Sequence, residues 1–209
     1  MIYMIKQGLL LTTILMISSC SQFSFYSDVY NAVKVSVIGA NDALISYSYF
    51  EDQPYSFLKV RFGRSAPVIM VLVSYNEGLA HWVSADKISI HTFKGKIVMT
   101  SGLLHDVHIL NPRVFSLQDK EKINFTVDFI EPAYYSGRFI SSIKKEEDLT
   151  RDYLGQPTRL SLYKESVKSD AIRFKSLNEY WVNENGKIII STQKIHPFLP
   201  SIELEFYFK

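Results

Sequence analysis

A two-residue hydrophobic alternation runs through most of this 209-residue chain and constrains its fold more than any other feature. Apolar residues occupy every second position in residues 58–62, 88–91, 125–129, 172–175 and 202–208, with mostly polar or charged residues between them. Strict alternation directs one set of side chains inward and the other toward water. The pattern therefore predicts antiparallel strands with one solvated face.

Short gaps that contain Gly or Asn separate several of these runs. Lys94-Gly95 joins two runs and residues 183–186 join another pair, as is typical of hairpin turns. Residues 68–73 are apolar throughout, so we expect a strand that is buried on both faces. Few helical patterns intervene, which disfavours a parallel α/β sheet. We predict a mainly β fold of roughly ten or more strands, in an antiparallel, strongly curved or barrel-like sheet that leaves few exposed edges.

Two segments depart from the strand pattern. Residues 23–35 show a ragged 3.6-residue period and predict a short N-terminal helix. Charged residues are dense around residues 146–153, which we expect to form a solvated loop or a short helix within one domain.

The N-terminus carries the three parts of a secretory signal peptide. Lys6 is followed by an apolar run over residues 9–17 and by small residues before Cys20. The run is shorter than the roughly twenty apolar residues that cross a bilayer as a helix. We expect residues 1–19 to be a signal peptide and residues 20–209 to form a single lipid-anchored, β-rich domain.

Cys20 is the only cysteine in the chain, so it has no intramolecular disulfide partner. Ile17-Ser18-Ser19-Cys20 resembles a bacterial lipobox, whose cysteine is lipidated and becomes the mature N-terminus. Several acyl chains would anchor the protein almost permanently, since each buried methylene adds about 0.8 kcal/mol. Ser21 resembles the sorting signal for the outer membrane, where we expect a periplasm-facing protein. The alternative is an ordinary signal peptide with an incidental thiol.

Charge and motif content argue against several functions. A formal net charge of +2 is too small for a nucleic-acid-binding surface. Catalytic signatures and a cofactor motif are not apparent, so we expect no enzyme and no cofactor. Residues 105–108 (His-Asp-Val-His) lack an identifiable third ligand for a metal. The carboxylate pairs Asp128/Glu131 and Glu203/Glu205 could be imagined in a glycosidase, but the second pair is more simply the wet face of a terminal strand.

Trp82 and Trp181 each stand at the start of a predicted hairpin. Aromatic faces stack on sugar rings, and tryptophan adds one hydrogen-bond donor to a large apolar area. Core packing is the expected role for both, and contact with a ligand is the alternative.

Two blocks of the sequence resemble the group 4 capsule polysaccharide lipoprotein family (GfcB/YjbF type). The first comprises Phe57-Leu58-Lys59-Val60-Arg61-Phe62-Gly63, Ala66-Pro67-Val68-Ile69-Met70-Val71-Leu72, Trp82-Val83-Ser84-Ala85-Asp86 and Gly95-Lys96-Ile97-Val98-Met99-Thr100-Ser101-Gly102-Leu103. The second comprises Asn178-Glu179-Tyr180-Trp181-Val182, Gly186-Lys187, Ser191-Thr192-Gln193 and Pro197. Lys96 and Met99 stand where the family pattern has Arg, which puts any contact made by those basic residues in doubt.

The resemblance implies a non-catalytic, outer-membrane-associated lipoprotein that serves capsule or exopolysaccharide assembly or export. Its partners would be polysaccharide-export proteins, the polysaccharide itself, and the membrane through the lipid on Cys20. Trp82, Asp86, Trp181 and Gln193 are the candidate ligand or partner contacts. Two other hypotheses remain open: a carrier for a lipid or lipoprotein, which needs a cavity inside the sheet, and a polysaccharide-modifying enzyme, which needs a catalytic pair in a cleft.

Overall fold

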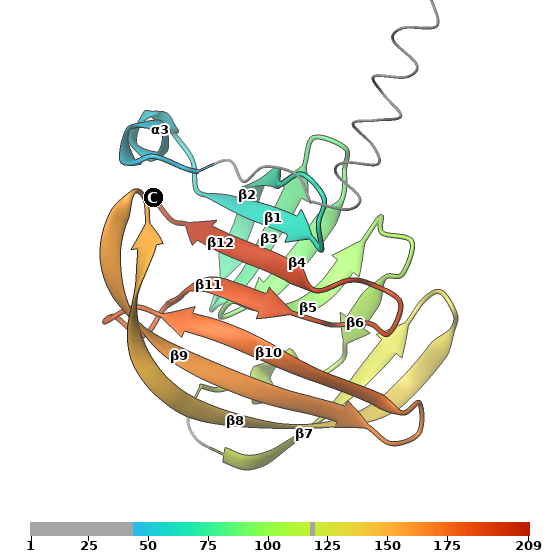
Figure 1. Ribbon diagram of the computed structural model, residues 1–209. Helices are drawn as coiled ribbons and strands as arrows, with labels where there is room; N and C mark the ends of the chain where they lie inside the picture. Colours follow the sequence, from blue (N-terminus) through green and yellow to red (C-terminus); the bar gives the residue numbers. More distant parts are fainter. Residues whose placement is uncertain (1–43, 118–119) are drawn as a thin grey trace, which may run out of the picture. The chain divides into compact units, whose positions relative to one another are not determined.

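Twelve antiparallel strands close into a barrel in the computed structural model, which describes residues 44–117 and 120–209 (Figure 1). The strands are β1 Phe57–Phe62, β2 Val68–Asn76, β3 Leu79–Ser84, β4 Ser89–Phe93, β5 Lys96–Ser101, β6 Val107–Ile109, β7 Lys120–Phe129, β8 Tyr134–Tyr153, β9 Gln156–Ser169, β10 Phe174–Val182, β11 Ile188–Gln193 and β12 Ile202–Tyr207. Each strand pairs with its neighbours in sequence, and β1 closes the ring against β12. The prediction of a barrel-like antiparallel sheet is confirmed.

The inner face of the barrel carries the alternating apolar residues. In the β1–β12 pair, Leu58 lies opposite Phe206 and Val60 opposite Leu204. All four side chains are buried. In β7, Phe125, Val127 and Phe129 belong to the same core, and the half-buried Thr126 and Asp128 lie between them. The two-residue period therefore identified the core-facing positions of these strands.

Both predicted hairpin turns are present. Lys94 and Gly95 connect β4 to β5 with φ angles of 49° and 89°. A two-residue turn with positive φ at both positions matches the twist of the flanking strands. In the turn between β10 and β11, the Asn183 side chain accepts hydrogen bonds from the backbone N–H groups of Asn185 and Lys187.

The expectation that residues 68–73 are buried on both faces is wrong. Of these residues of β2, Met70 is buried, whereas Val73 is 61% exposed. The pairing of β2 with β3 shifts register between Leu72 and Ser74, so Val73 lies at a bulge on the outside of the barrel.

Residues 146–153 do not form the expected loop or short helix. They belong to β8, which continues through a register shift between Lys145 and Asp148 and pairs with β9 as far as Tyr153. Figure 1 shows this long hairpin curving toward the C-terminal end of the chain. Its far end packs on the outside of the barrel, in a second apolar cluster formed by Leu149, Tyr153, Leu160, Leu162, Trp181, Ile189 and Ile190.

The packing of this hairpin on the outside of the barrel explains why an outward-facing side chain of β1 is buried. Lys59 of β1 stands at an expected water-facing position, yet it is only 4% exposed. Its Nζ binds Glu205 Oε1 at 3.1 Å, and Glu205 also accepts a hydrogen bond from the Tyr207 hydroxyl. Tyr207 stacks on Tyr153 of the hairpin at 5.4 Å between ring centroids. An aromatic layer outside the barrel therefore covers Lys59 and leaves Glu205 partly exposed.

A short helix, α3 Tyr47–Asp52, precedes β1 and is capped by the side chain of Ser46. A single 3₁₀ turn, η1 Pro112–Val114, lies before β7. The helix expected over residues 23–35, the signal peptide and Cys20 lie outside the described residues. Across residues 44–117 and 120–209, no helix has the length and apolar character needed to cross a bilayer.

Candidate functional site: a cavity at one end of the barrel

Side chains fill the barrel interior where two opposite walls meet. Gln193 of β11 is fully buried and reaches β5, which is not a neighbour of β11 in the barrel. Its Oε1 accepts a hydrogen bond of 2.9 Å from the backbone N–H of Ile97, and its Nε2 donates one of 2.9 Å to the carbonyl of Gly95. One side chain thus satisfies two backbone groups across the core.

A buried ion pair makes a second connection across the interior. Lys96 of β5 binds Glu165 of β9, and Glu165 also accepts hydrogen bonds from Asn178 (3.0 Å) and Tyr180 (2.7 Å). Burial by itself would raise the pKa of Glu165, but the charge of Lys96 and these hydrogen bonds hold it below its ordinary value. Burial and Glu165 raise the pKa of Tyr180 well above its usual range. The Lys96 amine also lies 5.0 Å from the ring centroid of Phe115.

Beyond these connections the interior opens into a cavity of about 900 Å³. It lies at the barrel end formed by the β2–β3, β4–β5 and β10–β11 turns and by the end of β12. The lining residues include Leu72, Tyr75, Ala80, Thr92, Lys94, Gly95, Phe115, Ser116, Leu117, Lys145, Tyr163, Val182, Lys187, Ile188, Phe208 and Lys209. Phe115 lines the cavity and contacts the amine of Lys96, so it separates the cavity from the buried ion pair.

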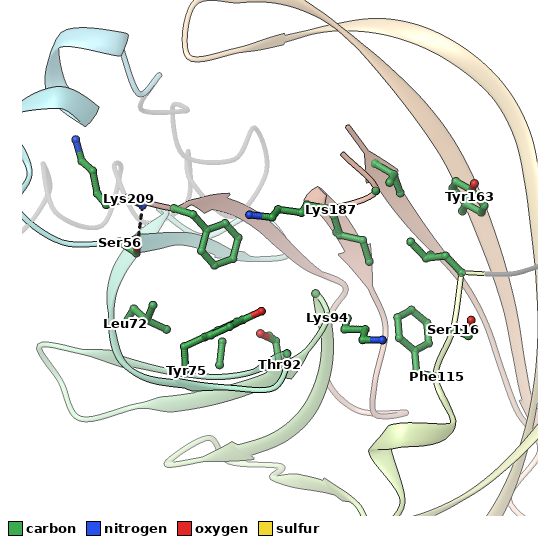
Figure 2. A pocket seen from close by; sticks show the side chains of 18 of the residues that line it. Ser56, Leu72, Tyr75, Thr92, Lys94, Phe115, Ser116, Tyr163, Lys187 and Lys209 are labelled. Atoms are coloured by element: carbon green, nitrogen blue, oxygen red, sulfur yellow. Dashed lines mark hydrogen bonds between the residues drawn. The ribbon is translucent and has the colours of Figure 1, made fainter. Parts of the chain in front are cut away.

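Two turns of the cavity wall approach each other closely at Gly95 and Ile188, and we call these residues together with Lys94 and Lys187 the waist. Gly95 makes the close approach possible, because a Cβ on it would lie 2.7 Å from the Cβ of Ile188. Lys94 and Lys187 flank this contact. In Figure 2 the two side chains extend in opposite directions, Lys94 toward Phe115 and Lys187 away from it.

Each side of the waist has aromatic walls. Tyr75 lies on one side, and Phe115 and Tyr163 on the other (Figure 2). Phe208 also lines the cavity, with its ring 5.9 Å from the Lys187 amine. The β2 bulge that exposes Val73 also restores Tyr75 to the inner face, opposite the core residue Ala80. A bulge of this kind re-aims a side chain and, here, places a phenol at the cavity entrance.

The charges that line the cavity are all of one sign. Among the described residues of its wall there are four lysines and no Asp, Glu, His or Cys. Lys145 binds Asp148 at 2.9 Å, and Lys209 donates to the Glu51 carbonyl at 3.2 Å. Lys94 and Lys187 enter none of the ion pairs found within residues 44–117 and 120–209; their amines lie 5.4 Å and 5.9 Å from the rings of Phe93 and Phe208.

The predicted contact residues do not come together. Trp82 is fully buried inside the barrel, where its Nε1 donates to Thr92 and its ring packs 5.7 Å from that of Phe208. Trp82 therefore supports two residues of the cavity wall, and Gln193 supports a third, Gly95. The expected core packing of Trp82 is confirmed.

Trp181 and Asp86 lie elsewhere. Trp181 is 7% exposed and packs outside the barrel, under the β8–β9 hairpin, with the Arg151 guanidinium 4.4 Å from its ring centroid. Its expected core role is borne out in this outer cluster. Asp86 is exposed in the β3–β4 turn, at the barrel end away from the cavity, and Ser84 rather than Asp86 caps that turn by accepting from the Ile88 N–H.

Residues 105–108 serve the turn between β5 and β6. Asp106 accepts hydrogen bonds from Thr100, Gly102 and Leu103. The His105 ring stacks on His196 at 5.0 Å. Within the part of the chain that the structure describes, no group of three His, Cys, Asp or Glu side chains could hold a metal ion.

Sequence reasoning missed Lys94, Lys187 and Tyr75 as site residues. The turns that carry the two lysines were recognised, but no local pattern indicates that they face each other across a barrel. Of the two positions that depart from the family pattern, Lys96 is in the buried ion pair and Met99 lies between His91 and His108 in the sheet.

Fold and site together define a closed antiparallel β-barrel with a cationic, aromatic cavity at one end. The sequence profile described as "Group 4 capsule polysaccharide lipoprotein gfcB, YjbF" matches residues 30–207, so the chain belongs to this lipoprotein family. The predicted family membership is confirmed.

A solved structure supports the fold. The crystal structure of the hypothetical lipoprotein YmcC from Escherichia coli (K12) aligns with a TM-score of 0.71 over 87% of this chain and 95% of that chain, at 17% sequence identity. No curated protein sequence matches the chain significantly.

Proposed function

We propose that this protein is a non-catalytic accessory factor in the assembly or export of a capsule or exopolysaccharide, held at the outer membrane by the lipid on Cys20 and facing the periplasm. Membership of a capsule polysaccharide lipoprotein family supports the process and the membrane anchor. The single structural observation that carries the proposal is the cavity at the end of the barrel, because it offers a binding site with space for a ligand.

The composition of the cavity wall favours binding over hydrolysis. A glycosidase needs two carboxylates, one to protonate the leaving oxygen and one to act as nucleophile or base. Serine nucleophiles need an adjacent base. Among the described lining residues there is no carboxylate or imidazole to accompany Ser56, Thr92 or Ser116. The proposed role is therefore capture or guidance of a ligand without turnover.

A lipid or lipoprotein carrier also requires a cavity, so the fold alone does not separate the two functions. The family description names a capsule polysaccharide, which favours the accessory role. In addition, every charged side chain among the described residues of the cavity wall is a lysine, which suits an anionic polar ligand better than an acyl chain.

Polysaccharide output in a deletion strain tests the proposed function. Polymer would be measured in intracellular, periplasmic and surface fractions, with complementation by the wild-type gene, by Cys20→Ala and by the conservative Ser18→Ala control. We expect polymer to be retained inside the deletion strain and restored to the surface by the wild-type and Ser18→Ala chains but not by Cys20→Ala. An unchanged amount and location of polymer in the deletion strain would refute the role.

A further inference from the structure

The waist carries two lysines, and no carboxylate lines the cavity among the residues that the structure describes. Lys94 comes from the β4–β5 turn and Lys187 from the β10–β11 turn, and the contact of Gly95 with Ile188 holds the two turns together. Neither amine enters an ion pair within the described residues. Two ammonium groups beside low-dielectric walls create a local positive potential that attracts anions.

The other two lysines of the wall are already engaged. Lys145 is bound to Asp148, and the amine of Lys209 lies 4.0 Å from the ring centroid of Phe50 while it donates to a backbone carbonyl. Figure 2 shows the Lys209 side chain directed away from the space that Lys187 enters. The cationic feature of the cavity is therefore the Lys94–Lys187 pair.

Flat apolar surfaces lie on both sides of that pair. Tyr75 forms one, and Phe115 and Tyr163 the other. Aromatic faces pack against the apolar faces of sugar rings, and the two phenol hydroxyls can also donate to ring substituents. An extended ligand would thus meet aromatic wall, then positive charge, then aromatic wall again.

We propose that the cavity binds a segment of an acidic polysaccharide, with anionic substituents of the sugars bound by Lys94 and Lys187 and sugar rings packed on the aromatic walls. The inference rests on the proposed function and names its ligand class. A lipid acyl chain fits the same space poorly, because it offers no hydrogen-bond acceptor to the ammonium groups that line it.

Binding of defined probes to the purified, detergent-solubilised lipoprotein tests the inference by isothermal titration calorimetry. The probes are hexagalacturonate as an acidic oligosaccharide, cellohexaose as a neutral one and decanoate as an anion with an acyl chain. We expect hexagalacturonate to bind and to weaken as salt increases, and the other two to bind at least about 10-fold more weakly. Tighter binding of decanoate or of cellohexaose than of hexagalacturonate would overturn the ligand assignment.

Paired variants locate the site. Lys94→Gln/Lys187→Gln removes both amines of the waist, whereas Lys87→Gln/Lys175→Gln removes the same charge from exposed positions outside the cavity wall. We expect the first pair to weaken hexagalacturonate binding about 10- to 100-fold and the second to leave it unchanged. Equal effects of the two pairs would mean non-specific charge attraction and would overturn the site. A circular dichroism spectrum and unfolding midpoint equal to those of the wild type show that the first variant is folded.

Export measurements separate this inference from the proposed function. Normal surface polymer in cells that carry only the Lys94→Gln/Lys187→Gln chain, alongside a defective deletion strain, would overturn the ligand assignment and leave the accessory role intact. Normal surface polymer in the deletion strain itself would remove the accessory role.

Discussion

Gln193 Oε1 and the backbone N–H of Ile97 form a 2.9 Å hydrogen bond between strands on different sides of the barrel. The same side chain reaches Gly95, which belongs to the waist of the cavity. A buried amide that hydrogen-bonds two distant backbone groups, and also Ser191 of its own strand, makes one arrangement of the two walls more favourable than any other. The position of the cavity therefore depends on a residue that does not line it.

Removal of this side chain should destabilise the barrel. Gln193→Ala leaves the Ile97 N–H and the Gly95 carbonyl without their partner in the core, which costs about 1–3 kcal/mol of unfolding free energy. Urea denaturation measures the loss. Gln156→Ala, at an exposed position next to the hairpin turn, should change stability by less than about 0.5 kcal/mol. Equal stability of both variants would show that the cross-barrel bonds contribute nothing.

A methyl group at Gly95 should be more costly than one at Gly186. Both glycines have positive φ, 89° and 74°, so alanine is strained at either position. Only at Gly95 would the new Cβ meet another side chain, Ile188 at 2.7 Å, whereas nothing lies within 4 Å of the corresponding position at Gly186. We expect Gly95→Ala to lose about 1–3 kcal/mol more than Gly186→Ala in urea denaturation. The same loss in both would mean that the waist can widen freely.

Loss of Lys96 should leave Glu165 as an uncompensated buried charge. Lys96→Met is expected to cost about 3–5 kcal/mol of unfolding free energy at pH 7, and the double variant Lys96→Met/Glu165→Gln should recover most of it. Chemical denaturation of the two variants at pH 7 provides the comparison. A double variant no more stable than the single one would contradict the assignment.

The contribution of Glu165 to the unfolding free energy should change with pH in opposite directions in the wild type and in Lys96→Met. In the wild type the pKa of Glu165 is depressed, so its stabilisation is present above the unfolded-state pKa and is lost as pH falls through the folded-state pKa. Without Lys96, burial raises the pKa of Glu165, so Lys96→Met should become relatively more stable as pH falls from 7 to 5. If the difference in unfolding free energy between the wild type and Lys96→Met widened as pH fell from 7 to 5, this prediction would be contradicted.

His196 should stay neutral in the folded protein at mildly acidic pH. Burial, with a smaller contribution from His105, lowers the pKa of His196 to about 4, and its Nδ1 accepts a hydrogen bond from the Phe198 N–H. The unfolded chain takes up this proton near pH 6.5, so stability should fall by up to about 3 kcal/mol as pH drops from 6.5 to 4. NMR titration of the imidazole, assigned with His196→Gln, checks this. A midpoint near 6.5 would contradict it.

Trp181 should be important for stability although it lies outside the barrel. Trp181→Ala removes the aromatic surface that joins β10 to the β8–β9 hairpin and should cost about 3–5 kcal/mol in urea denaturation. Leu177→Ala, exposed on the same strand, is the matched control and should have little effect. A stable Trp181→Ala chain with impaired polymer export would instead identify a contact residue.

Strand positions and turns could be predicted because they depend on neighbours in sequence. The alternation at residues 125–129 and the Lys94-Gly95 turn each contain their own structural information in a few residues. The two segments whose structure was predicted wrongly depend on packing between residues distant in sequence. The apolar run of residues 68–73 predicts two buried faces because hydrophobicity alone does not reveal a bulge. The dense charge of residues 146–153 predicts a solvated loop or a short helix, but it is equally compatible with an exposed strand.

The sequence by itself determined the β character of the chain, its family and a good part of its core-facing residues, because a two-residue period and tight turns are local properties. It also suggested an export signal and a lipid anchor at Cys20. Tertiary structure alone decided that Lys94 and Lys187 share one cavity, that Gln193 joins opposite walls and that Trp181 lies outside the barrel. The physical reason is that closure determines which strands face each other across the interior, and no pattern within a single strand encodes its distant partner.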